Sequence, residues 1–485
     1  MRRAGFGAIV LALAGAYGLM ARAPAGEVAY GFRYERAGDA FVSIDIAWPE
    51  PLAAPRSLVF PRAVPMGYGE QRYDAFVSDL RAFTPDGGIS VPEREEGPRW
   101  RLPAGARRVT YRVDLRRMEG EIRAASDASR VRDGYLGALG YSVFAFVEGS
   151  EPRPARLRVS GPEGWPVFST LAPRAPAAAA PADVRASDFY ALADSQIVMG
   201  PRAAVRRIAE APVPLYLAVY SEGTVDLDRL GRLAAASLAR VAGYFGTIPF
   251  AHYTVHMELL APISPDHEYG MSMEHLDSST YYLASPFGPA SSTAPEEELG
   301  VLFNFAHHMA HAWVPKRAYG DGYLPFQWEI APVIDSIWFA EGFGQYAAIA
   351  ALAAGMPDPS AYRQRMLARR FRSNVAGAPD FLRQLPLVAL SRVASTRYAE
   401  DFRTGRLVFS RGGLMAAAID DRIQAASGGT RSLRDALRFL VAWSARERRG
   451  FRVDELAGLI QEGAGVDVRA VIDEWLRPLP DVAVR

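Results

Sequence analysis

The most informative stretch of this chain is His307-His308-Met309-Ala310-His311. His307 and His311 are four residues apart, so on a helix their side chains lie on one face. Two histidines with this spacing form the metal-binding pair of the zinc motif His-Glu-x-x-His, in which the Glu acts on the metal-bound water. Here His308 stands where the motif has its Glu. These residues therefore predict a zinc site and leave its chemistry open.

A candidate third ligand follows in the apolar segment Trp338-Phe339-Ala340-Glu341-Gly342-Phe343. Its one carboxylate, Glu341, needs a charged partner or a proton if it is buried. A zinc ion held by two neutral imidazoles would supply that partner. Three protein ligands and one open position are typical of catalytic zinc. The alternative is a helix N-terminal charge that faces solvent.

Length and composition limit the class of protein. The 485 residues suggest about three domains of roughly 150 residues each. With 49% hydrophobic and 22% charged residues, the chain can bury large cores. The net charge of +1 and the lack of a strongly basic half argue against a nucleic-acid partner. The absence of cysteine excludes disulfides, thiolate zinc sites and a cysteine nucleophile.

The N-terminus has the pattern of a signal peptide. Arg2 and Arg3 precede an apolar run over residues 4–20, and an Ala-x-Ala-type cleavage site ends at Ala25. We expect residues 1–25 to be removed and the product to be periplasmic or secreted; an uncleaved N-terminal anchor is the alternative. No later run is long and apolar enough to span a bilayer. The mature chain is therefore expected to have no membrane attachment.

The rest of the chain divides into three expected regions. Residues 26–211 read as a β-sandwich-like domain, because apolar and polar residues alternate and Pro/Gly turns separate the runs. The clearest alternating runs are residues 40–48, 107–115 and 155–160.

Residues 212–327 contain strand candidates at 215–220, 253–257 and 280–283 and a helix that Asp226 can cap. Residues 328–485 read as separate helices, expected over 337–354, 414–426, 433–446, 454–462 and 468–476. The expected fold class is α+β multidomain.

Around these motifs the chain resembles the glycyl aminopeptidase family of gluzincin zinc metallopeptidases. The family's His-Glu-x-x-His is followed by a Trp-x-x-Lys-Arg segment, matched here by Trp313-Val314-Pro315-Lys316-Arg317. Its third ligand lies in Trp-x-x-Glu-Gly-Phe, matched at Glu341. Its edge-strand segment Leu-Glu-His-x-x-Ser is matched by Met273-Glu274-His275-Leu276-Asp277-Ser278. Lys316, the only lysine, falls at the family's lysine.

The resemblance implies a fold and a set of residue roles. It implies a thermolysin-like α/β lobe over 212–327 and a C-terminal helical lobe, with one zinc ion between them on His307, His311 and Glu341. It also implies that Glu274 helps to recognise a substrate's free amino group. Peptides or proteins are then the expected partners.

Two departures from the family pattern put hydrolysis in question. His308 replaces the general-base Glu, and loss of a general base costs roughly 10²–10⁴ in rate. The family's Tyr-x-Lys-Gly segment, whose Tyr stabilises the oxyanion, is best matched by Phe409-Ser410-Arg411-Gly412. Loss of one oxyanion donor costs another ~10²–10³. Tyr398 and Arg411 are the possible substitutes.

Three functional hypotheses remain from the sequence. One is an exported zinc metallopeptidase with aminopeptidase-like preference and His308 as an atypical base, so that hydrolysis is weak or lost. The second is an inactive zinc-binding pseudopeptidase that binds peptides or a protein partner. The third is a structural protein without metal.

Overall fold

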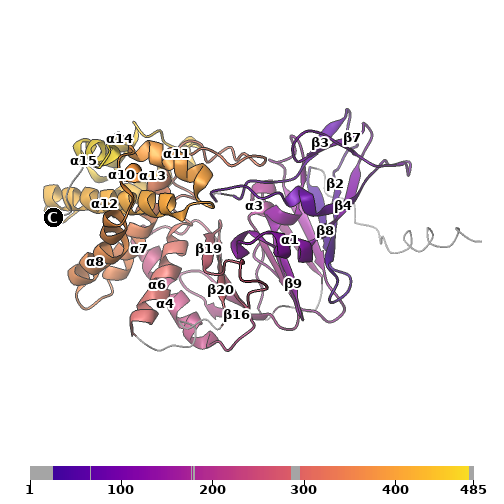
Figure 1. The fold of residues 1–485 in the computed structure, drawn as a ribbon, viewed down its shortest axis with the longest axis horizontal. Coiled ribbons are helices and arrows are strands. Elements are labelled where there is room, and N and C mark those ends of the chain that lie inside the picture. Colours follow the sequence, from indigo (N-terminus) through magenta and orange to yellow (C-terminus); the bar gives the residue numbers. More distant parts are fainter. Residues whose placement is uncertain (1–25, 66, 176, 178–180, 286–294, 480–485) are drawn as a thin grey trace, which may run out of the picture.

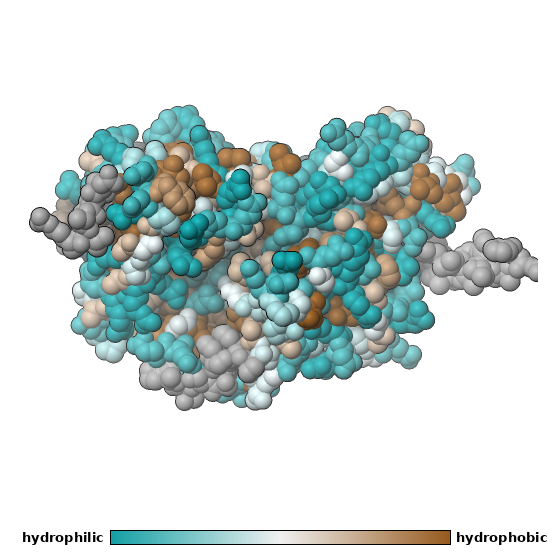
Figure 2. Space-filling view, in the orientation of Figure 1, coloured by the Kyte–Doolittle hydropathy of each residue, from teal (hydrophilic) through white to brown (hydrophobic). Residues whose placement is uncertain are grey.

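The computed structural model describes residues 26–65, 67–175, 177, 181–285 and 295–479. The signal peptide expected over residues 1–25 lies outside the described residues. The fold is mixed α+β, as expected: Figure 1 shows a sheet-rich N-terminal region, a central α/β region and a helical C-terminal region. The face in Figure 2 is mainly hydrophilic, with scattered hydrophobic patches. No described helix has the length and apolar character required to cross a membrane.

Three sheets build the N-terminal region. The largest has seven strands in the order β14-β12-β1-β2-β8-β4-β5, and two four-stranded sheets have the orders β13-β15-β10-β9 and β11-β3-β7-β6. The strands are β1 Val28–Arg33, β2 Phe41–Ala47, β3 Arg56–Val59, β4 Val77–Phe83, β5 Ile89–Ser90, β6 Glu93–Arg94, β7 Arg99–Leu102, β8 Arg108–Asp114, β9 Arg130–Arg132, β10 Tyr135–Leu139, β11 Phe146–Val147, β12 Ala155–Ser160, β13 Val167–Ser169, β14 Ala182–Ala186 and β15 Gln196–Met199. The short helices are η1 Tyr73–Phe76, α1 Leu115–Glu121, η2 Ala125–Asp127, α2 Gly140–Val143 and α3 Phe189–Ala193.

The alternating runs of the sequence form the centre of the seven-stranded sheet. β2, β8 and β12 correspond to the runs expected at 40–48, 107–115 and 155–160. On β2 the apolar side chains of Val42, Ile44 and Ile46 are buried in the N-terminal core, as alternation along a half-buried strand requires.

A five-stranded sheet forms the central region, in the order β16-β17-β18-β20-β19. β17, β18 and β20 are parallel, while β16 and β19 pair antiparallel at the two edges. The elements are β16 Ala204–Ala209, β17 Leu215–Ser221, α4 Leu227–Phe245, β18 Tyr253–Leu260, β19 Met271–Glu274, β20 Ser278–Ala284 and α6 Pro295–Ala310. Since β16 belongs to this sheet, we propose to place the boundary with the N-terminal region before β16 rather than at residue 211.

Both faces of this sheet are covered, which explains why β17 is buried along almost its whole length. Leu215, Leu217 and Val219 join a core that contains α4 and α6, whereas Tyr216 and Tyr220 pack into the N-terminal core. A strand covered on both faces reads as a continuous apolar run. The central sheet is therefore held between two layers, with β19 at its edge.

The C-terminal region is helical from residue 338. Its elements are η3 Trp338–Phe343 (a π-helix), α7 Gly344–Ala353, α8 Pro359–Leu367, η4 Ala368–Arg372 (a π-helix), α9 Ser373–Ala376, α10 Asp380–Arg383, α11 Leu387–Arg397, α12 Phe402–Ser427, α13 Leu433–Glu447, α14 Leu456–Ala464 and α15 Arg469–Leu476.

Helix α12 begins well before residue 414, where the sequence pattern places its start. The pair Gly412-Gly413 lies inside the helix, although glycine usually weakens a helix interior. Any side chain at Gly412 would collide with the Trp338 carbonyl. The glycines therefore allow α12 to pack closely on η3, the element that carries Glu341.

Candidate metal centre

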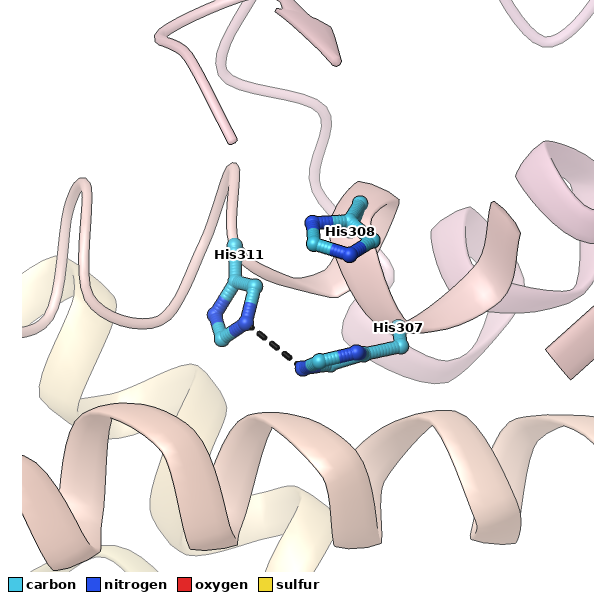
Figure 3. Close-up of side chains that lie close together, drawn as sticks. All are labelled: His307, His308 and His311. Carbon is cyan, nitrogen blue, oxygen red and sulfur yellow. Dashed lines mark hydrogen bonds between the residues drawn. The ribbon is translucent and has the colours of Figure 1, made fainter. Parts of the chain in front are cut away.

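His307 and His311 face each other at the C-terminal end of α6. Their Nε2 atoms are 2.7 Å apart, as the dashed line in Figure 3 marks. α6 ends at Ala310, but the His311 backbone N–H still donates to the His307 carbonyl at 3.2 Å, so the helical spacing reaches His311. His311 Nδ1 lies 2.7 Å from the Val314 carbonyl and donates to it, because a carbonyl only accepts. This contact fixes the ring and turns His311 Nε2 toward the centre.

Glu341 approaches the same point from η3. Its Oε2 lies 3.6 Å from His307 Nε2 and 3.5 Å from His311 Nε2. Glu341 is only 6% exposed, which argues against the alternative of a solvent-facing helix charge. The structure thus brings together the three ligands expected from the sequence, two from α6 and its end and one from η3.

These donor atoms fit a zinc ion after a small adjustment. Zinc with bonds of about 2.0–2.1 Å in tetrahedral geometry needs donor atoms roughly 3.3 Å apart. The two carboxylate–imidazole distances are close to that value. The distance between the two Nε2 atoms is shorter, so the rings would have to separate by about 0.6 Å, which a slight rotation supplies.

The charges around the donors also favour a cation. Burial lowers the pKa of His307 to about 4, so this imidazole stays neutral near pH 7. Burial opposes protonation of His311, but Glu274 and Glu341 outweigh it and raise the pKa of His311 to about 9. Two buried carboxylates thus act on one imidazole. Buried carboxylates of this kind require positive charge beside them.

Glu274 lies beside this group, at the end of the edge strand β19. Oxygen atoms of Glu274 and Glu341 and a ring nitrogen of His311 lie within 4.8 Å of one another. Burial raises the pKa of the Glu274 carboxyl. Glu274, the residue expected to receive a substrate amine, therefore lies next to the candidate metal ligands His311 and Glu341.

His308 lies beside the pair formed by His307 and His311, with ring nitrogens of all three within 4.8 Å of one another, and it also contacts β19. Its Nε2 lies 2.6 Å from Ser272 Oγ, and its Nδ1 lies 3.8 Å from Glu274 Oε2. In Figure 3 no dashed line joins His308 to the other two histidines. Nδ1 is buried and has no hydrogen-bond partner among the described residues. Burial and the two neighbouring imidazoles lower the pKa of His308 well below its usual value.

A tyrosine that the sequence analysis missed also reaches the centre. The Tyr68 hydroxyl, from a loop of the N-terminal region, donates to Glu341 Oε1 at 3.3 Å and lies 3.2 Å from the Tyr323 hydroxyl. No motif marks Tyr68. Only the packing of the N-terminal region against the helical region brings it to Glu341, so the sequence contains no local signal for it.

The residues considered for the oxyanion role are placed differently. Phe409 packs its ring against Tyr68 and Tyr398, with ring centroids 6.4 and 5.8 Å apart. Arg411 is fully buried, and its guanidinium donates to the backbone carbonyls of Leu385, of Trp475 in α15 and of Arg477 after α15. Arg411 therefore has a structural role. Among the described residues, it is the Tyr68 hydroxyl that donates to the candidate ligand Glu341.

Lys316 supports the centre from outside it. Its Nζ donates to Asp194 Oδ1 and to the Pro65 carbonyl, both at 3.3 Å, and its side chain is fully buried. Asp194 Oδ1 also lies 3.0 Å from Nδ1 of His275, the residue that follows Glu274 in the chain. Lys316 and His275 thus join the segment after α6, strand β19 and the N-terminal region through one carboxylate.

Comparisons with known proteins identify one family and one fold. The model of the Peptidase M61 N-terminal domain matches residues 29–201, and the model of the M61 glycyl aminopeptidase matches residues 301–380. No curated protein sequence matches the chain.

Solved structures share the fold at low sequence identity. An aminopeptidase N family protein from Idiomarina loihiensis is 17% identical, with a TM-score of 0.79 over 94% of this chain and 77% of that one. A mutant M1 zinc metallopeptidase from Deinococcus radiodurans, bound to a Tyr-Ser-Ala substrate, is 17% identical, with a TM-score of 0.53 over 94% of each chain. Native yeast LTA4 hydrolase is 11% identical, with a TM-score of 0.56 over 93% of this chain and 67% of that one.

Proposed function

Because the chain belongs to the M61 glycyl aminopeptidase family, we propose that it is an exported zinc metallopeptidase-like protein whose peptide-bond hydrolysis is weak or lost. His307, His311 and Glu341 would hold one zinc ion, and Glu274 would receive the amino group of a peptide. Zinc, when bound, would polarise the scissile carbonyl and lower the pKa of a water molecule. The product would be periplasmic or secreted, as the N-terminal pattern predicts.

The position of His308 carries the proposal of weak hydrolysis. A general base must lie within hydrogen-bond reach of the proton that it takes. Nε2 of His308 is engaged with Ser272, so Nδ1 is the nitrogen without a hydrogen-bond partner among the described residues and the one free to exchange a proton. Nδ1 is turned toward Glu274, where the substrate amine would lie. A neutral imidazole also lacks the negative charge that a Glu would place beside the water.

The second candidate is an inactive zinc-binding pseudopeptidase that binds peptides or a protein partner. Two observations favour it: Phe409 has no hydroxyl to donate, and the Arg411 guanidinium is engaged with backbone carbonyls. Both candidates use the same metal ligands. They differ in whether His308 transfers protons at all.

Metal analysis tests what the two candidates share. The purified mature protein should contain about one zinc per chain by elemental mass spectrometry. His311→Ala should lose the zinc. His267→Ala is the matched control, because His267 contacts Ser264 and the Glu119 carbonyl, away from the centre, and this variant should keep the zinc. A native protein without metal after gentle purification would refute both candidates.

A hydrolysis assay separates the weak metallopeptidase from the inactive pseudopeptidase. The zinc-loaded protein should cleave aminoacyl substrates slowly if His308 acts as a base, and not at all if it is a pseudopeptidase. Turnover at ordinary aminopeptidase rates would show that both candidates understate its activity.

A further inference from the structure

A pocket of about 400 Å³ opens in the helical region, next to the candidate metal centre. Its walls come from α6, α7, the continuous segment α8–η4–α9, and α12. Figure 1 shows α7, α8 and α12 together in the helical part of the molecule. Four arginines line the pocket: Arg365, Arg369, Arg370 and Arg406.

The positive charge of this pocket is mostly uncompensated. Glu296 is the only carboxylate among the lining residues, and it pairs with Arg369 at 2.8 Å. The guanidiniums of the other three arginines lie over aromatic rings. In the part of the chain that the structure describes, none of the three forms an ion pair: Arg365 lies over Tyr362, Arg370 over Phe303 and Arg406 over Phe402. The pocket therefore offers charged donors to an anion.

The arginines come from two helical segments. Arg365, Arg369 and Arg370 lie on the continuous segment α8–η4, and Arg406 lies on α12. A set of arginines that lines one cavity is suited to planar oxyanions, above all carboxylates.

Three connections join the pocket to the metal centre, two of them through packed side chains. Arg370 lies 3.8 Å from the centroid of the Phe303 ring, and that ring stacks on His307 with centroids 5.9 Å apart. Phe409 lines the pocket and packs against Tyr68, whose hydroxyl donates to Glu341.

Gln345 provides the third connection. It lines the pocket four residues after Glu341 on the same helical segment. The pocket thus lies on the side of His307 and Glu341.

Glu274 ends β19, and His308 of α6 contacts this strand. No residue of β19 lines the pocket, whereas the pocket connects with His307 and Glu341. A peptide that places its amino group at Glu274 and extends past His307 and Glu341 would bring its carboxyl end to the arginines. The positive amino end of a short peptide would then lie at the Glu274 carboxylate, and its negative carboxyl end would lie at the arginines.

We propose that the arginine-lined pocket binds a carboxylate of the peptide whose amino end lies at Glu274. The ligand class is a short peptide with a free C-terminus, or a peptide with an acidic side chain at the same distance from its amino end. This inference rests on the proposed function, because it takes the peptide across the same centre.

Binding of a tripeptide that cannot be cleaved tests the proposal without requiring turnover. The probe is Ala-Ala-Ala with its first peptide bond reduced to a methyleneamine, titrated into the zinc-loaded full chain by calorimetry at low salt. The free acid should bind at least roughly tenfold more tightly than its C-terminal amide, the size of one lost charge-assisted contact. A reduced tripeptide amide with Asp in the third position distinguishes an acidic side chain from the C-terminus as the source of the carboxylate.

Variants then assign the preference to the pocket. Arg406→Gln and Arg365→Gln should each reduce the difference between acid and amide, and the double variant should abolish it. Arg422→Gln is the matched control: Arg422 is exposed on the same helix α12 but does not line the pocket, so this variant should keep the difference.

Two results would overturn the proposal. Acid and amide could bind equally, or the acid preference could survive in the double variant. Either result leaves the proposed function intact. Failure of every probe to bind the zinc-loaded protein would instead refute peptide binding itself, and the pocket proposal with it.

Discussion

At the scale of single residues, one substitution separates metal binding from proton transfer. His307, His311 and Glu341 keep the ligand types that zinc requires, and their donor atoms lie near the spacing that zinc needs. His308, between the two candidate histidine ligands, contacts Ser272 of β19. The same five residues that indicate the metal thus also weaken the expectation of hydrolysis.

Ser272→Ala tests whether β19 holds His308. The change removes the hydroxyl that lies 2.6 Å from Nε2 and leaves a buried ring nitrogen without its partner. An unsatisfied buried polar group costs about 1–3 kcal/mol, so the free energy of unfolding should fall by that amount in a denaturant titration. Ser272→Thr keeps a hydroxyl and should recover most of the loss. Equal stability of Ser272→Ala and the native protein would contradict the contact.

Tyr68→Phe tests the contact between the N-terminal region and Glu341. Groups that hydrogen-bond to a metal ligand typically contribute 10–100-fold to metal affinity. Loss of the Tyr68 hydroxyl should therefore weaken zinc binding by roughly tenfold in a competition titration with a chelator. Tyr398→Phe is the matched control, because the Tyr398 ring packs on Tyr68 while, among the described residues, the hydroxyl that hydrogen-bonds to Glu341 is that of Tyr68. Equal losses in both variants would point to ring packing as the cause.

At the scale of elements, the centre depends on the ends of α6, η3 and β19. The sequence predicts the first two well, because a pair of histidines at helical spacing and a single carboxylate in an apolar segment are local patterns. Helix α4 was also predictable: it spans Leu227–Phe245, and the Asp226 side chain accepts a hydrogen bond from the Arg229 backbone N–H. The early start of α12 was not, because Gly412-Gly413 reads as a helix break until its contact with Trp338 is known.

Asp226→Ala tests the cap of α4, the helix that packs against α6. Loss of an N-cap side chain costs about 1 kcal/mol, so the unfolding midpoint should fall while the zinc content stays unchanged. Asp228→Ala, in the first turn of the same helix, removes a charge without removing the cap. Its effect should be smaller. The reverse order of the two effects would contradict the cap.

At the scale of the whole molecule, the N-terminal and central regions meet through the carboxylate of Asp194. It contacts Lys316 and His275 and accepts from the Leu276 backbone N–H. This junction explains the position of the only lysine, which the sequence marked without indicating its partner. Tyr68 at Glu341 was equally beyond the sequence, because both contacts join residues far apart in the chain.

The pH dependence of stability tests this junction. Burial alone would raise the pKa of Asp194, but Lys316 and His275 outweigh burial and hold the pKa below its usual value. A carboxyl whose pKa is lowered by folding stabilises the fold above its unfolded pKa of about 3.9, and this contribution is lost as the pH falls further. Asp194→Asn should therefore flatten the fall in unfolding free energy below about pH 4.

Lys316→Met provides the complementary change, because it leaves Asp194 buried without its lysine. Breaking a buried ion pair from one side costs about 3–5 kcal/mol, so the unfolding free energy near pH 7 should fall by that order. Asp183→Asn, which breaks a surface pair with Arg156, is the control and should have little effect. If the unfolding free energy of Asp194→Asn fell below about pH 4 as steeply as that of the native protein, the proposed role of Asp194 would be contradicted.

We propose that this chain keeps a zinc centre of the glycyl aminopeptidase type and that His308 limits its chemistry. The most direct test compares the hydrolysis of an aminoacyl substrate by zinc-loaded native protein and by zinc-loaded His308→Glu. Restoring a general base should raise the rate by roughly 10²-fold or more, with the zinc content unchanged. A native rate equal to or above that of His308→Glu, with zinc in both proteins, would contradict the claim.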